Sequence, residues 1–137
     1  MADVAVVGGG PAGLSAAQYA AKNDLETIAF DTDESWMHKA HLFNYPAVRS
    51  ISGEEFLTIA RGQARDRGAT LYETEVTAIE QTDDGFVLTT DDDKYTAAYV
   101  VLATGGDRSL AEDLGCAFTE EDVVDVTVDM ETSVENV

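Results

Sequence analysis

Three glycines near the start of the chain have the spacing of a phosphate-binding turn. Gly8, Gly10 and Gly13 form the pattern GxGxxG within VAVVGGGPAGLSAAQY. In such a turn the first glycine permits a sharp reversal, the second lets backbone approach a pyrophosphate, and the third lets a helix pack closely on the preceding strand. Unpaired N–H groups at the start of that helix attract phosphate. The pattern therefore predicts a phosphate-bearing ligand at this turn.

The neighbouring segments predict the strand and the helix that such a turn requires. Residues 4–7 are a short apolar run, typical of a strand buried on both faces. Residues 11–22 predict a helix with proline in its first turn and a stripe of small apolar residues. Residues 27–30 predict a second strand, which completes a right-handed βαβ unit with a parallel sheet.

Asp31 directly follows this second strand. A carboxylate at that position accepts hydrogen bonds from the ribose of the adenosine half of a dinucleotide and disfavours a 2′-phosphate. Dinucleotide binding is therefore the main hypothesis, and a glycine turn needed only for packing is the alternative.

The middle of the chain predicts a long loop and a second helix. Residues 31–52 carry aromatic and histidine side chains without a clear period. Ser52 is predicted to cap a helix over residues 53–67, with Glu55 at the capping-box position, and Gly68 is predicted to end it. The inward side chains of this helix are expected to be Phe56, Leu57, Ile59, Ala60 and Ala64.

The second half of the chain has the period-two alternation of strands. Residues 70–79, 86–90 and 95–98 predict an antiparallel meander, broken by the turns TDDG and TDDDK. Residues 100–103 predict another buried strand, and residues 123–128 a final one. The predicted fold class is α/β, with residues 1–137 as a single Rossmann-like three-layer domain that combines a parallel sheet with a small antiparallel β-meander.

The net charge is the one extreme feature of the composition. Asp and Glu number 27 against 8 Lys and Arg, for a net charge of −19. Nucleic acid and anionic membrane surfaces would repel such a chain, and no apolar run is long enough to span a bilayer. We expect a cytoplasmic protein with a solvated acidic surface suited to high salt, and a dedicated face for a basic partner is the alternative.

The chain resembles the FAD domain of the pyridine nucleotide–disulfide oxidoreductases, and in particular the thioredoxin reductases. The resemblance rests on GGGPAG, on YTAAYVVLATGG, on the Asn44-Tyr45-Pro46 loop and on the segment VDMETSVENV. It implies a domain that binds FAD, with the pyrophosphate at the glycine turn, the adenosine ribose at Asp31 and the flavin side near Asn44. The cofactor-binding residues implied in this way are Gly8, Gly10, Pro11, Ala12, Gly13, Asp31, Asn44, Val76, Ala103, Thr104 and Gly105.

The sequence also departs from that family. The segment after Gly106 leads within about fifteen residues into the family's closing segment, so the inserted NAD(P)H domain and its CxxC pair are expected to be absent. The sequence stops at Val137, where the family's last strand and its Gly-Asp would begin. We expect either a fragment of a longer protein or a reduced form that receives electrons from a partner.

Three functions remain open at this stage. The first is electron transfer through FAD, with NAD(P)H bound transiently, a separate reductase or a redox partner protein as the electron source, and with no catalytic side chain assigned. The second is a non-catalytic sensor or assembly module that binds FAD or NAD. The third is the NAD domain of a dehydrogenase, which the meander disfavours. A homodimer is a further expectation from the resemblance.

Other chemistry is not favoured. His38 and His41 have helical spacing but lack further ligands for a metal, and Cys116 is a lone thiol. Trp36 and Tyr45 are expected to pin the long loop to the core, with stacking on a flavin as the alternative.

Overall fold

A computed structural model describes residues 1–137, which form an α/β fold built on a six-stranded sheet. The parallel part of the fold contains β1 (Ala2–Val7), α1 (Pro11–Lys22), β2 (Thr27–Phe30), α2 (Gly53–Asp66) and β5 (Thr70–Tyr72). The excursion between β2 and α2 contains a 3₁₀ turn, η1 (Trp36–Lys39), and a two-stranded sheet of β3 (His41–Leu42) and β4 (Ile51–Ser52). The second half contains β6 (Ala78–Thr82), β7 (Gly85–Thr89), β8 (Lys94–Leu102) and α3 (Ser109–Asp113).

The strand order of the main sheet is β5-β2-β1-β8-β7-β6. The pairs β5–β2, β2–β1 and β1–β8 are parallel, and β8–β7 and β7–β6 are antiparallel. Strand β1 is central: Val4 is opposite Thr27 on one side and Tyr99 on the other. The glycine turn therefore emerges from the middle of the sheet, where a topological switch brings the ends of several strands together.

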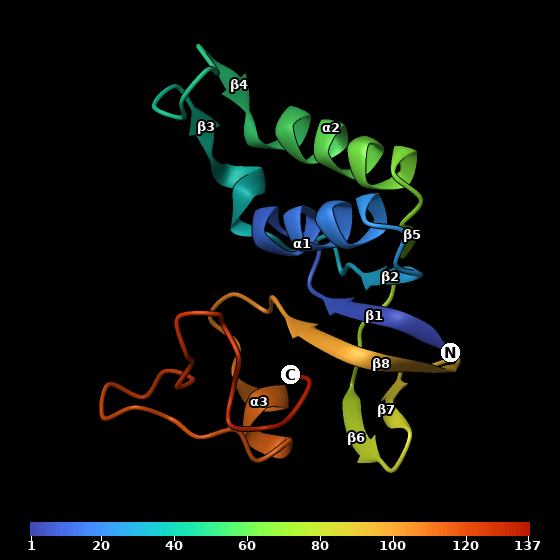
Figure 1. Ribbon diagram of the computed structural model, residues 1–137. Helices are drawn as coiled ribbons and strands as arrows, with labels where there is room; N and C mark the ends of the chain where they lie inside the picture. The colour runs from blue at the N-terminus through green and yellow to red at the C-terminus, as the bar shows by residue number, and fades with distance from the viewer.

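Two apolar clusters divide the domain into three layers (Figure 1). Val4, Val6 and Ala29 face α1 and α2, where they pack with Leu14 and Leu57. The opposite face of the same strands packs on the meander, in a cluster that contains Ala5, Val7, Phe30, Phe86 and Leu88. The helices, the parallel sheet and the meander thus form the three layers that the sequence predicted.

The first thirty residues fold as predicted. Helix α1 has the predicted bounds, and its stripe of small residues is buried at Ala17 and Ala21 because it lies directly on the sheet. Helix α2 begins at the predicted cap, where the Ser52 hydroxyl accepts a hydrogen bond from the Glu55 N–H at 3.2 Å. Gly68 follows the helix with φ of +106°, which only glycine adopts without strain. No helix combines the length and apolar character needed to cross a bilayer.

The prediction of a continuous strand over residues 70–79 is wrong. Residues 70–72 form β5 and pair in parallel with β2, and only the segment from Ala78 onward belongs to the meander. Alternation alone does not specify which strand lies next to another. One alternating pattern therefore covered two strands, of which β5 pairs in parallel and β6 pairs in antiparallel fashion. Residues 95–98 and 100–103, predicted as separate strands, are instead mostly one strand, β8, which links the meander to the parallel sheet.

The predicted strand at residues 123–128 does not form. Only an isolated bridge between Phe118 and Val124 is present, and the segment is flanked by Asp122 and Met130, both with positive φ. No neighbouring strand pairs with this segment, and Val128 is 93% exposed. An apolar alternating run without a partner has no ladder to satisfy its backbone, so it does not become a strand.

Two smaller expectations also needed correction. The segment 31–52 is not a plain loop, because it contains η1 and the β3–β4 pair. Ile59 is 47% exposed rather than inward, since the buried face of α2 is centred on Leu57 and Ala64.

Candidate functional site

Two glycines of the turn are required by the chain's own atoms. Gly8 has φ of +117°, and a Cβ there would lie 2.1 Å from the Ala103 carbonyl oxygen. A Cβ on Gly13 would lie 1.8 Å from the Gly8 carbonyl oxygen. The first glycine therefore allows the turn, and the third allows α1 to approach it closely.

Gly10 is different, because the protein itself leaves room for a side chain there. Its φ of −78° and ψ of −173° are extended values that any residue adopts. A Cβ would meet only the side chain of Ser35, whose Oγ would be 3.3 Å away and would have to shift by a few tenths of an ångström. Backbone packing therefore does not explain this glycine, whereas a pyrophosphate that approaches the backbone at this position of the turn would explain it.

The start of α1 also has unused hydrogen-bond donors. Gly10 is the N-cap and offers no side-chain cap, and the first turn contains no acidic residue. The first backbone bond of the helix runs from the Leu14 N–H to the Gly10 carbonyl oxygen, so the N–H groups of Ala12 and Gly13 have no protein acceptor. Such donors and the positive end of the helix dipole together favour an anion.

Asp31 lies beside this turn and is buried, with 7% of the residue exposed. A Cβ on Gly9 would lie 2.0 Å from the Asp31 Cγ, so the middle glycine makes room for the carboxylate. Asp31 Oδ1 accepts a hydrogen bond from the Asp33 N–H at 2.8 Å. Asp31 Oδ2 accepts a hydrogen bond from Arg61 Nε at 2.9 Å and forms an ion pair with Arg61 Nη2 at 2.8 Å.

Arg61 belongs to a small charge network that joins α2 to the loop after β2. Its Nη2 also contacts Asp33 Oδ1 at 2.5 Å, and His38 Nε2 lies 2.8 Å from the same oxygen. These hydrogen bonds, from Arg61 first and then His38, lower the pKa of the Asp33 carboxyl from its usual 3.8. The Glu54 carboxylate is 3.7 Å from His38 Nδ1 and closes the network at the start of α2.

The other predicted cofactor residues divide into three places. Ala103, Thr104 and Gly105 follow β8 next to the glycine turn, and the Ala103 N–H donates to the Val7 carbonyl oxygen at 2.8 Å. Val76 is buried in the meander-side cluster. Asn44 is exposed in the connection between β3 and β4, which projects beyond the start of α2 (Figure 1). The glycine turn, Asp31 and the end of β8 thus come together, Val76 packs in the same cluster as Val7 and Phe30, and Asn44 lies apart in the β3–β4 connection.

The sequence predictions did not include Gly9, Ser35 or Arg61. Gly9 is visible in the sequence as the middle of three consecutive glycines. Arg61 also had a signal, since it lies four residues after Leu57 and three before Ala64, which places a charge on the buried face of α2. Ser35 had none, because its position beside Gly10 depends on the path of an irregular loop.

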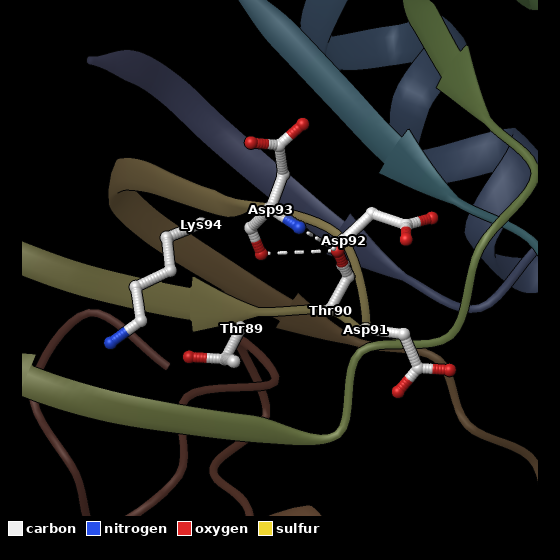
Figure 2. A pocket seen from close by; sticks show the side chains of 6 residues that line it. All are labelled: Thr89, Thr90, Asp91, Asp92, Asp93 and Lys94. Atoms are coloured by element: carbon white, nitrogen blue, oxygen red, sulfur yellow. Dashed lines mark hydrogen bonds between the residues drawn. The ribbon is translucent and has the colours of Figure 1, made fainter.

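A shallow hollow at the β7–β8 turn lies away from these residues and does not have the character of a ligand site. It is lined by the β7–β8 turn, shown in Figure 2, with Thr89, Thr90, Asp91, Asp92, Asp93 and Lys94. The Thr90 hydroxyl donates to the Asp93 carbonyl oxygen at 3.0 Å and accepts from the Asp93 N–H at 3.1 Å. The turn therefore satisfies its own polar groups, and its carboxylates are part of the acidic surface.

The residues set aside in the sequence have separate surroundings. His38 contacts Asp33, whereas His41 contacts the Ser50 hydroxyl at 2.7 Å, and no group of three or more metal-ligating side chains forms. Cys116 is buried. Trp36 is 84% exposed and Tyr45 is 55% exposed, so these two rings do not pin the loop to the core as predicted.

The three layers, the parallel βαβ unit and the glycine turn define a Rossmann-like domain of the FAD-binding type. Residues 2–109 match the family described as pyridine nucleotide-disulphide oxidoreductase. The chain belongs to this family, which confirms the resemblance that the glycine turn and the segment ending at Gly106 predicted.

Thioredoxin reductases are prominent among the similar proteins. The thioredoxin reductase of Treponema pallidum (strain Nichols) is 41% identical over 116 residues, which make up 77% of this chain and 36% of that protein. The solved thioredoxin reductase from Gloeobacter violaceus has a TM-score of 0.71 at 32% identity, covering 76% of this chain and 36% of that one. The atypical thioredoxin reductase TRi from Desulfovibrio vulgaris Hildenborough has a TM-score of 0.73 at 30% identity, covering 87% and 43%. The chain thus spans well under half the length of these relatives.

Proposed function

We propose that this chain binds FAD at the glycine turn and belongs to a flavoprotein oxidoreductase of thioredoxin-reductase type. The observation that carries the proposal is Gly10: its backbone is ordinary and a Cβ there would meet only the Ser35 side chain, so we attribute the glycine to a ligand rather than to the fold. The family match over residues 2–109 supports FAD in particular.

The residues at the turn fit a pyrophosphate and an adenosine. The free N–H groups of Ala12 and Gly13 would bind the pyrophosphate, and Gly10 would leave room for it. Asp31 would accept a hydrogen bond from a ribose hydroxyl, as expected for a cofactor without a 2′-phosphate. In this proposal Thr104, Gly105 and Asn44 contact the flavin half, while Val76 lies on the adenosine side.

The bound flavin would supply the redox chemistry, and this chain's residues would bind and orient it. The single cysteine of these 137 residues is buried, so they contain no dithiol that could exchange electrons with a flavin. We propose that the hydride comes from NAD(P)H, bound transiently or held by a partner protein. A thioredoxin-like acceptor is proposed only from the names of the relatives.

One alternative is a dinucleotide-binding module without redox turnover, because the open donors of the turn and Asp31 fit the pyrophosphate and ribose of any such cofactor. Anaerobic addition of NADH or NADPH to the FAD-loaded protein separates the two functions. Loss of the visible flavin absorbance, and its return when air is admitted, would support the oxidoreductase. Bound flavin that stays oxidised with both donors, and is reduced by dithionite, would contradict transient binding of NAD(P)H by this chain and support the binding module.

A further inference from the structure

Arg61 is the only cationic side chain placed against the predicted ribose-binding carboxylate. Its side chain is 20% exposed, and its Nη2 makes contacts of 2.8 Å to Asp31 and 2.5 Å to Asp33. The contacts use Nε and Nη2, and Nη1 has no protein partner. Two carboxylates therefore share one guanidinium, and its charge is already balanced within the protein.

These contacts leave Asp31 with little freedom. Arg61 Nε donates to Oδ2 and the Asp33 N–H donates to Oδ1, so one donor at each oxygen fixes the plane of the carboxylate, with Arg61 Nη2 2.8 Å from Oδ2 as an ion pair. An ionised carboxylate has about four acceptor positions, so these two hydrogen bonds leave at least one position for a ligand. That position is fixed before a ligand arrives, so a ribose hydroxyl can be bound without reordering Asp31.

The surrounding charges also bear on which ribose is accepted. Asp33 shares the Arg61 Nη2 with Asp31, His38 contacts Asp33, and Glu54 lies near His38. A 2′-phosphate would enter among these carboxylates, where the Arg61 charge is already balanced by Asp31 and Asp33. An uncharged hydroxyl meets no such repulsion.

We propose that Arg61 is a positioning residue that orients Asp31 so that the site recognises the unphosphorylated ribose of an adenine dinucleotide. This inference rests on the proposed function, because it assumes that adenosine diphosphate binds at the glycine turn. Arg61 acts through Asp31, and it contributes to discrimination at the ribose rather than to contact with the pyrophosphate.

The test compares ADP with 2′,3′-dideoxy-ADP, which lacks both ribose hydroxyls, by calorimetric titration of the purified protein. One hydrogen bond to a charged group corresponds to a preference of about tenfold or more for ADP in the parent protein. Arg61→Gln should reduce that preference to less than about threefold while binding of the dideoxy compound stays nearly unchanged. Arg61→Lys keeps the charge but cannot bridge both carboxylates with a rigid fork, so it should give an intermediate preference.

Arg65→Gln is the matched control, since Arg65 lies one turn further along α2, is exposed and makes no ion pair. It removes the same charge and should keep the full preference. An undiminished preference in Arg61→Gln, or an equal loss of affinity for both ligands, would overturn the positioning role. If Arg61→Gln does not fold, an undiminished preference in Arg61→Lys would overturn it. Failure of the parent protein to bind either ligand would instead refute the proposed dinucleotide site, and this inference with it.

Discussion

The two long helices of this domain begin in opposite ways. Helix α2 is completed by its own sequence: Ser52 caps the Glu55 N–H, and Glu54 and Glu55 lie in the first turn, next to the positive end of the helix. Helix α1 has a glycine at its N-cap, no side-chain cap and no acid in its first turn. This contrast occurs in a chain with 27 acidic residues, so a missing acid is itself informative.

Both helix starts have unpaired N–H groups and the positive end of a helix dipole, but one start uses them for folding and the other leaves them for a ligand. The start of α2 is fully used in folding, and no ligand is needed to explain it. The start of α1 keeps free N–H groups beside an open Gly10, which costs stability in the absence of a ligand and provides a site for an anion. The following predictions test whether these two helix starts are as different as their structures indicate.

The largest effect is expected for Gly13→Ala. A Cβ 1.8 Å from the Gly8 carbonyl oxygen would push α1 away from the turn, which should destabilise the fold by about 3 kcal/mol or more. Gly62→Ala is the control, because that glycine lies inside α2 with no atom within 4 Å of a Cβ, and the change should stabilise the helix by up to about 1 kcal/mol. Urea unfolding measures both, and equal stability of the two variants would show that the close packing at Gly13 is not required.

Gly10→Val should separate binding from folding. The valine would occupy the space left for the pyrophosphate and reduce FAD affinity by about two orders of magnitude, while poorer N-capping costs only about 1 kcal/mol of stability. Gly10→Asp should block the same site and give α1 the cap that it lacks, raising the stability of the ligand-free protein by a few tenths of a kcal/mol. Flavin fluorescence titration and urea unfolding measure the two properties, and undiminished FAD affinity in either variant would show that the ligand is misplaced.

Ser52→Ala tests the other helix. Loss of the cap on α2 should destabilise the protein by about 1 kcal/mol, because the Glu55 N–H loses its acceptor. FAD affinity should remain at the parent value, since the start of α2 is used only in folding. A loss of affinity comparable with that of Gly10→Val would remove the distinction between the two helix starts.

The smallest effect concerns acid. The pKa of Asp33 lies below 3.8 in the folded protein because Arg61 and His38 bind the carboxylate. The ionised Asp33 therefore stabilises the fold fully above about pH 3.8, and this stabilisation is lost as the pH falls through the lowered pKa. Asp33→Asn should therefore reduce the loss of stability between about pH 5 and about pH 3. Unfolding curves across this range for the parent and the variant measure the change, and parallel curves would contradict it.

The parts of the fold that the sequence predicted well are those with a local physical cause. The apolar run before Gly8, the proline at the start of α1 and the cap at Ser52 each act within a few residues, and the structure has all three as expected. The family resemblance rested in part on the same local features, since one of its four motifs is the glycine turn.

The errors concern partners that are distant in sequence. Residues 70–79 alternate throughout, but only the three-dimensional arrangement shows that 70–72 pair with β2 and that 78–82 pair with β7. Residues 123–128 have strand composition without a strand beside them. The same limit applies to the site: Asp31 was visible at the end of a strand, whereas its ion pair with Arg61 joins residues 30 positions apart.

The most direct test of the central claim is the visible spectrum of the purified protein in high salt, recorded before and after addition of FAD and removal of the excess by desalting. The account predicts a flavin spectrum with close to one FAD per chain in the parent protein and in Ser52→Ala, and none retained by Gly10→Val. A folded parent protein that retains no flavin, or a Gly10→Val variant that retains as much as the parent, would contradict the claim that the open start of α1 is the cofactor site.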